Sequence, residues 1–200
     1  MVIDFTPLRE RKLKAGEFSA HYTLADIRET AVAGIAFMRE LIADLDDADV
    51  TFDPVDPEAN DPYARAGEEH IGWSIAHLIV HVTASTEEGA ALTSVLARGI
   101  SYPNEVRLRY ETDWRTVTKK SQLEQRLDES LRMRLAFLDS MPDKPLLATV
   151  KRSDRFVELF GETDYKATYI FSLMHEFGHH AQMLEVKRQA IEGRKAAAAR

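Results

Sequence analysis

Apolar residues recur every three or four positions along four segments of the chain, a period typical of helices with one buried face. The first segment begins at Thr23, with Asp26 as its capping-box partner, and extends to about Asp46. Residues 51–69 contain three prolines and predict a long loop after this helix. The buried stripe of the first helix is expected to hold Leu24, Ile27, Ala31, Ile35, Met38, Leu41 and Leu45.

The second predicted helix, from about Trp73 to Arg98, is apolar on nearly every side in its first half. A helix of this kind lies among other helices and not on a surface. Gly99 follows it directly and is well placed as its C-terminal cap. Residues 102–118 then predict a second irregular stretch. We expect this stretch and the loop 51–69 to cover one end of the helices.

The third helix is predicted from Ser121, paired with Glu124 as a capping box, to Pro142. Residues 146–160 alternate weakly and are compatible with a short hairpin. The fourth helix is predicted from about Thr163 to Glu192, with residues 196–200 as a frayed end. Four long helices without a series of strands predict an all-α four-helix bundle with long inter-helix loops, as a single domain over residues 1–200.

Charge and composition exclude some classes of partner. The chain has 200 residues, 26 Lys and Arg against 33 Asp and Glu, and a net charge of −7, which argues against binding nucleic acid or anionic lipid. No apolar run is long enough to cross a membrane, and the first twenty residues do not read as a secretory signal. Because cysteine is also absent, we expect a cytoplasmic protein.

Candidate chemistry lies in the histidines. Two pairs have the form His-x-x-x-His: His77 with His81, and His175 with His179. On a helix this spacing places both imidazoles on one face, one turn apart, which is how a single helix offers two nitrogen ligands to a metal. Only one histidine of the first pair need face the fourth helix. Gly178 costs that helix about 1 kcal/mol relative to alanine, which suggests that a helix or ligand approaches the backbone there.

Other polar residues are expected to have no special role. His180 points about 100° away from its neighbour His179 and is expected to face solvent or support the ligands. His21 is expected to lie in a loop, as is His70. Glu87 and Glu88 are expected to form a solvated patch on the second helix.

Residues 175–179 also read as His-Glu-x-x-His, the zincin signature, in which two histidines hold zinc and the glutamate, here Glu176, activates water. The surroundings argue against a protease. Gln182 stands where a metzincin has glycine, and Glu185 stands where it has a third histidine. Glu192 is the remaining candidate for a downstream ligand, but it lies on the same predicted helix. A zinc protease is therefore the least favoured alternative.

Over nearly its whole length the chain resembles the DinB-like superfamily, also called the YfiT-like metal-dependent hydrolases, a group of bacterial four-helix bundles. The resemblance rests on a tryptophan-led second helix, with Trp73 eight residues before His81. It rests also on His175-x-x-x-His179-x-x-Gln182 near the C-terminus. The order, the spacing and the placement in helices agree with the family.

The resemblance implies a divalent metal, nickel or zinc, bound by His81, His175 and His179. His77 and Gln182 would then support the ligands or line the pocket. Glu176 departs from the family pattern, and it would belong to the same outer group or lie at the surface. Relatives that use a low-molecular-weight thiol suggest a transferase or isomerase, and the family description suggests a hydrolase. Either would be a metal-dependent enzyme with a small-molecule substrate.

Two further expectations remain open at this point. The histidines are also compatible with a non-catalytic bundle that binds metal for stability or sensing only. Exposed faces of the bundle are compatible with a homodimer, although the sequence does not require one.

Overall fold

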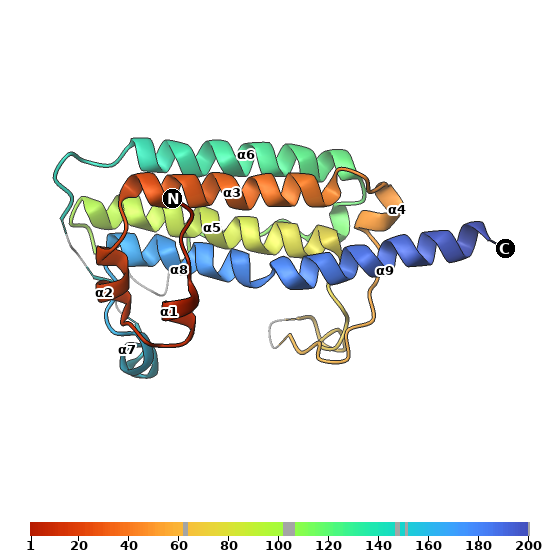
Figure 1. Ribbon diagram of the computed structural model, residues 1–200, viewed down its shortest axis with the longest axis horizontal. Helices are drawn as coiled ribbons and strands as arrows, with labels where there is room; N and C mark the ends of the chain where they lie inside the picture. Colours follow the sequence, from red (N-terminus) through yellow and green to blue (C-terminus); the bar gives the residue numbers. More distant parts are fainter. Residues whose placement is uncertain (62–63, 102–106, 147–148, 151, 200) are drawn as a thin grey trace.

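Four helical columns pack side by side in the computed structural model, which describes residues 1–61, 64–101, 107–146, 149–150 and 152–199 (Figure 1). Within these residues there is no strand, only a single antiparallel bridge between Val150 and Thr163. The predicted all-α four-helix bundle is therefore confirmed. The columns are α3 (Leu24–Ile42), α5 (Ile75–Ala97), α6 (Lys120–Asp139), and α8 (Tyr165–Gly178) continued by α9 (His180–Ala198).

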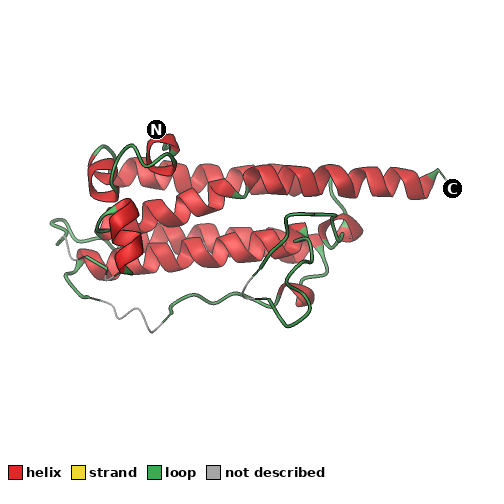
Figure 2. Cartoon of the chain, turned by 90° about the horizontal axis from the view of Figure 1, so that it is seen from below, coloured by secondary structure: helices red, strands yellow, loops and turns green. Residues whose placement is uncertain are grey.

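The bundle has a long crossover between two parallel helices. α5 packs against α6 and α8, and α3 packs against the same two helices, so α3 and α5 occupy opposite corners. α3 and α8–α9 run in one direction, and α5 and α6 run in the other (Figure 1). The chain from α5 to α6 must therefore return along the length of the bundle, and Figure 2 shows its described part on the outside of the helices.

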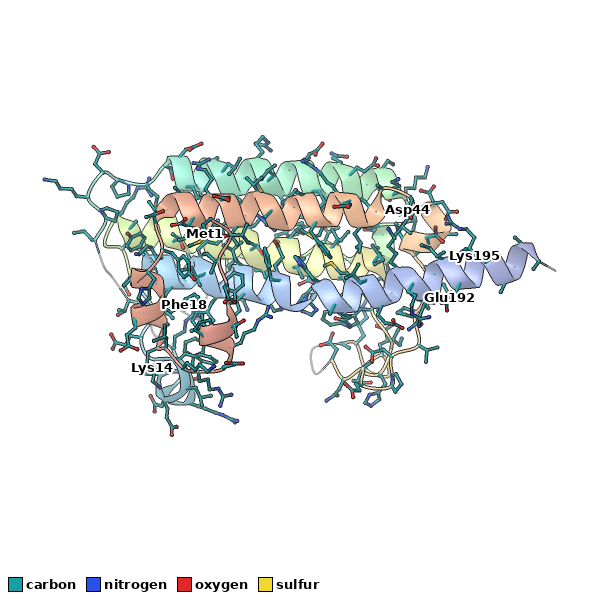
Figure 3. All side chains as sticks on the ribbon, viewed as in Figure 1. Met1, Lys14, Phe18, Asp44, Glu192 and Lys195 are labelled. Atoms are coloured by element: carbon teal, nitrogen blue, oxygen red, sulfur yellow. The ribbon has the colours of Figure 1, made fainter. Side chains whose placement is uncertain are left out.

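Short elements cover the two ends of the bundle. α2 (Ala15–Ala20) and α7 (Asp154–Phe160) lie near the start of α8, where Phe18 of α2 is buried, and α1 (Thr6–Arg9) lies beside the second half of α8, where Arg9 donates to the carbonyl of Met174 (Figure 1 and Figure 3). α4 (Asp47–Val50) and the 3₁₀ helix η1 (Trp114–Thr116) lie at the other end, from which α9 projects beyond the bundle. None of the helices in the described residues is long and apolar enough to span a bilayer.

Side-chain caps explain where the long helices begin. Thr23 accepts a hydrogen bond from the backbone N–H of Asp26 at 3.2 Å and donates its own N–H to the Asp26 carboxylate at 2.9 Å, which is the predicted capping box. Ser74 caps α5 by accepting from the N–H of His77 at 3.2 Å. Gly99 follows α5 with a φ of 75°, a left-handed conformation that glycine adopts without strain. The predicted end of the second helix is thus confirmed.

Two predicted boundaries are wrong because a nearby side chain offers a better cap. α3 ends at Ile42 and not near Asp46, because the Asp46 carboxylate accepts from two backbone N–H groups and starts α4. α6 begins at Lys120, where Gln122 accepts from the N–H of Lys119 at 3.0 Å, so Ser121 does not act as the cap. The stretch 146–160, which is compatible with a short hairpin, forms α7 over residues 154–160, and its residues 147–148 and 151 lie outside the described part of the chain.

The predicted fourth helix is broken in the middle. α8 ends at Gly178, His179 forms a turn, and α9 begins at His180. The N–H of His179 bonds to the carbonyl of Glu176 at 3.0 Å, three residues back, so the backbone tightens to a 3₁₀-like turn there. Among the described residues, a Cβ at position 178 would meet only Arg9 Nη2, at 3.9 Å, so no close approach seen there explains this glycine. The helix also continues to Ala198, past the start of the expected frayed end.

A buried ion pair lies where the four columns meet. Arg134 of α6 donates to Glu176 of α8 at 2.6 Å, and both side chains are 0% exposed. Thr86 of α5 donates to the same carboxylate at 3.0 Å. Gly34 of α3 makes room for it, because a Cβ there would lie 2.0 Å from Glu176 Oε1. The other three columns therefore each contribute one residue around this carboxylate of α8, with an apolar cluster toward each end of the bundle.

Replacing Arg134 by methionine is expected to destabilise the protein strongly. The change leaves the Glu176 carboxylate buried without its cation, which typically costs about 3–5 kcal/mol of unfolding free energy. Urea denaturation followed by circular dichroism measures this loss. Arg132→Met, on the exposed face of the same helix, is the matched control and should change stability by less than about 0.5 kcal/mol.

The double variant Arg134→Met with Glu176→Met removes both charges and should recover most of the lost stability. If Arg134→Met were as stable as Arg132→Met, the ion pair would not hold the columns together.

Candidate metal centre

Three histidine side chains from two columns converge in the groove between α5 and α8. His81 Nε2 lies 3.2 Å from His175 Nε2, and His179 Nε2 lies 3.2 Å from the same atom. One ring nitrogen of each histidine lies within 4.8 Å of the other two. These are the three residues that the family resemblance implies as ligands, brought together from α5, the end of α8 and the turn before α9.

Two of the three separations between these nitrogens suit a shared divalent cation. Nitrogens bound about 2.0–2.1 Å from one zinc ion lie about 2.9 to 3.4 Å apart, and both 3.2 Å separations fall in that range. Without a cation, only one of these two contacts can be a hydrogen bond, because His175 Nε2 carries either one hydrogen or one lone pair. A bound cation would satisfy the remaining lone pairs.

Burial keeps the imidazoles of His175 and His179 in the neutral form that binds metals. Burial, together with the neighbouring His179 and His81, lowers the pKa of His175 to about 3. Burial also lowers the pKa of His179. At neutral pH both rings therefore carry a lone pair for a metal without first losing a proton.

Gln182 fixes the orientation of His179. Its Oε1 lies 2.8 Å from His179 Nδ1, so it accepts the ring N–H and leaves Nε2 bare toward the cluster. Gln182 follows His179 by three residues and therefore lies in the first turn of α9, directly after the break between α8 and α9. The structure thus puts Gln182 beside a candidate ligand, in the outer group to which the sequence assigned it.

Two charged residues of the crossover lie at the corresponding nitrogen of His81, and of the two only Glu111 can accept its proton, because a guanidinium only donates. Glu111 Oε1 lies 3.3 Å from His81 Nδ1, and Arg109 Nη2 lies 2.9 Å from the same nitrogen while also pairing with Glu111. Burial opposes ionisation of Glu111, but the hydrogen bond to His81 and the charge of Arg109 lower its pKa to about 2. When Nε2 binds a metal, Nδ1 carries the proton, and Glu111 is then its acceptor.

His77 does not join the cluster. Its ring is stacked between Trp73, at a centroid distance of 4.2 Å, and Trp114, at 4.8 Å. Burial in this stack and the nearby His81 lower its pKa to about 4. The structure therefore places His77 in the wall of the pocket, not among the candidate ligands.

A cavity of about 710 Å³ opens onto His81 and His175. The two irregular stretches of the chain supply much of its wall, as expected, together with Trp73 and His77. Ion pairs cross-link these stretches, among them Arg65 with Asp113 at 2.9 Å and Arg115 with Glu68. The candidate ligands are thus reachable by a small molecule from one side.

Glu176 is not where the sequence placed it. Its carboxylate is 0% exposed, bonds to Arg134 and Thr86, and belongs to neither the surface nor the pocket. One residue along a helix rotates the side chain by about 100°, so His175 faces the groove while Glu176 faces the bundle interior. This geometry gives Glu176 no part in activating a water at the histidines, which argues against the zincin reading.

The remaining zincin candidate also lies away from the cluster. Glu192 lies on the exposed part of α9 toward the C-terminus, where it pairs with Arg188 at 2.6 Å (Figure 3). Glu185 pairs with the same arginine at 2.6 Å. Neither carboxylate is among the groups that could share a metal within the described residues.

Three residues expected to be solvated are partly or fully buried. The ring of His180 stacks on Phe37 at 3.8 Å between centroids. Glu87 is buried beside Arg126, at 2.8 Å, and Glu88 is buried beside Arg107. The physical reason for the two glutamates is that α5 is enclosed by α6, α8 and the crossover, so its polar residues are covered as well as its apolar ones.

Comparison with known proteins identifies the family of the chain. The family model described as the DinB superfamily matches residues 23–183, which include all three histidines and Gln182. No curated protein matches the chain significantly. No solved structure matches it either.

His77 is expected to make the protein acid-sensitive. Its folded-state pKa of about 4 lies below the unfolded value of 6.5, so the unfolded chain binds this proton first as the pH falls. Stability contributed by neutral His77 is therefore present above about pH 6.5 and is lost as the pH falls toward 4. Thermal melts at several pH values should show a weaker dependence for His77→Phe than for wild type. A slope unchanged from wild type and from the control His21→Gln would contradict this role.

Gln182 is expected to tune metal affinity. Gln182→Leu removes the acceptor for His179 Nδ1–H, and loss of such a partner typically weakens metal binding about 10- to 100-fold. Gln182→Glu keeps an acceptor oxygen and should hold affinity near or above that of wild type. Competition with a chromophoric zinc chelator measures both. Equal affinity of the leucine and glutamate variants would show that Gln182 does not act through His179.

Proposed function

The chain belongs to the DinB superfamily, and on this premise we propose that it is a metal-dependent enzyme acting on a small molecule. The observation that carries the proposal is the convergence of three imidazole nitrogens at the wall of a 710 Å³ cavity. A site of this kind combines a place for a cation with room for a substrate beside it.

His81, His175 and His179 are the residues that would hold the ion, with zinc or nickel as the proposed metals. Imidazole nitrogen suits both. When bound, the ion would supply Lewis-acid chemistry, polarising a carbonyl or lowering the pKa of a water or thiol.

The surrounding residues would prepare the ligands and the substrate. Glu111 and Gln182 would hold the Nδ1 protons of two ligands and so keep their Nε2 lone pairs directed at the ion. Trp73 and Trp114 would shield one side of the pocket from water and offer flat apolar faces to a substrate. The ion pairs between the two irregular stretches would hold the pocket wall in place.

The open pocket supports an enzyme over a bundle that binds metal for stability alone. Structural zinc sites are usually closed by four protein ligands, whereas catalytic sites have three and leave a position open. In the described part of the chain the group that could share a metal has three members, and two of them line the cavity. Hydrolysis and a transfer or isomerisation that uses a low-molecular-weight thiol both suit such a site, and we propose one of these reaction classes.

His175→Ala tests the metal site directly, because His175 Nε2 contacts both other ligands. After supplementation with zinc or nickel, wild type is expected to carry about one ion per chain and the variant less than a tenth of that. Elemental analysis after desalting measures the content, and circular dichroism checks the fold. His21→Ala is the control and should bind like wild type. Wild type as empty as the variant would overturn the proposal.

Turnover separates the enzyme from the metal-binding bundle. Wild type and His175→Ala can be screened for ester and amide hydrolysis and for conjugation of a small thiol to electrophiles. The enzyme proposal expects metal-dependent turnover in one of these assays and loss of at least about a hundredfold in the variant. A chelator that lowers the melting temperature of wild type, without any metal-dependent turnover, would favour the non-catalytic bundle instead.

A further inference from the structure

A second, smaller cavity of about 270 Å³ continues the groove between α5 and α8 away from the histidine cluster. His175, Arg107 and Arg109 line both cavities, so the two share a wall. On α5 the lining residues Ser85 and Glu88 follow His81 by four and seven positions, on the same face of the helix. At 1.5 Å per residue, the small cavity therefore extends about 10 Å from the cluster.

Positive charge predominates in the small cavity. Three arginines line it, Arg107, Arg109 and Arg152, against a single carboxylate among the described lining residues, Glu88. Glu88 is already engaged, because it pairs with Arg107 through two bonds and accepts the backbone N–H groups of Leu108 and Arg109 at 3.1 and 3.2 Å. The positive charge of Arg107 is therefore balanced within the protein.

The guanidinium groups of the other two arginines differ in their partners. Arg109 pairs with Glu111 on the side of the larger cavity. Arg152 has a long hydrogen bond to Thr163 Oγ1, at 3.4 Å, and stands 5.3 Å from the centre of the Phe156 ring. Among the described residues, Arg152 has no ion pair with a carboxylate. Its partial burial lowers its pKa, and the charge of Glu88 only partly opposes this effect, so a bound anion would offset a remaining cost.

The rest of the cavity suits an organic molecule. Ser85 and Ser172 bring hydroxyl groups to its wall, while Leu92, Phe156 and Phe171 bring apolar surface. A hydroxyl can donate to an anion, and the apolar side chains can cover a hydrocarbon segment. An inorganic anion would make no use of this apolar surface.

We propose that the small cavity is a carboxylate-binding subsite, in which Arg152 pairs with the carboxylate of a small organic acid. The hydrocarbon part of the acid would lie along Leu92 and Phe171, toward His175. That the other end reacts at the histidine cluster rests on the proposed function, whereas the pairing with Arg152 does not. The site therefore selects an acid whose carboxylate lies about two helical turns from the reacting group.

Binding of hexanoate to metal-free protein tests the subsite independently of the metal. Arg152→Gln removes the charge and keeps a polar side chain, and it should weaken hexanoate binding about tenfold or more, measured by NMR titration. Arg155→Gln, an exposed position on α7, is the matched control and should bind like wild type. Equal affinities of wild type and Arg152→Gln would overturn the proposal.

Inorganic phosphate tests whether the subsite binds any anion, and zinc-loaded protein tests whether an acid can span the subsite and the histidine cluster. Phosphate competing with hexanoate at equal or lower concentration would show a general anion site and overturn the organic-acid subsite. In zinc-loaded wild type, suberate should bind more tightly than succinate, because only the longer dicarboxylate reaches both Arg152 and the cluster. Arg152→Gln should abolish that preference while zinc content stays at the wild-type level. Failure to load zinc would count against the proposed function, with the hexanoate result unaffected.

Discussion

The buried ion pair between Arg134 and Glu176 determines which way α8 faces. A carboxylate cannot stay in the interior without its partner, so α8 must present Glu176 to α6 and to the space left by Gly34. Because His175 precedes Glu176 by one residue, this rotation directs the imidazole into the groove toward α5. The buried ion pair in the middle of the bundle thus sets the position of the His175 imidazole in the groove, although the ion pair and the imidazole do not touch the same surroundings.

The crossover between the parallel helices α5 and α6 supplies the second half of the site. It must travel the length of the bundle, and Glu88 fastens it to α5 by accepting two of its backbone N–H groups. This attachment places Arg109 and Glu111 beside His81, and Arg107 between the two cavities. Most charges along this path are paired within the protein. Arg152, which faces the crossover from the segment before α7, differs from them, because in the described part of the chain it has no ion pair with a carboxylate.

Local patterns in the sequence predict the helices and the histidine pairs, because period, caps and i to i+4 spacing are properties of one segment. Thr23 and Gly99 act as predicted for this reason. The break at His179 and the burial of Glu88 depend on what packs against each helix, and no single segment shows this. No sequence pattern around Glu111 predicts its place beside His81, because that place depends on the path of an irregular crossover.

The His-Glu-x-x-His string shows what a short motif determines and what it leaves to the rest of the fold. The string fixes only that the glutamate lies about 100° from the first histidine around a helix. Whether this direction leads to a metal pocket or to a protein core depends on the other three columns. Here Arg134 supplies a cation in that direction, Thr86 a hydrogen bond, and Gly34 the space of a missing side chain. These three residues, spread over about a hundred positions of the chain, give the glutamate a structural role away from the cavity that His81 and His175 line.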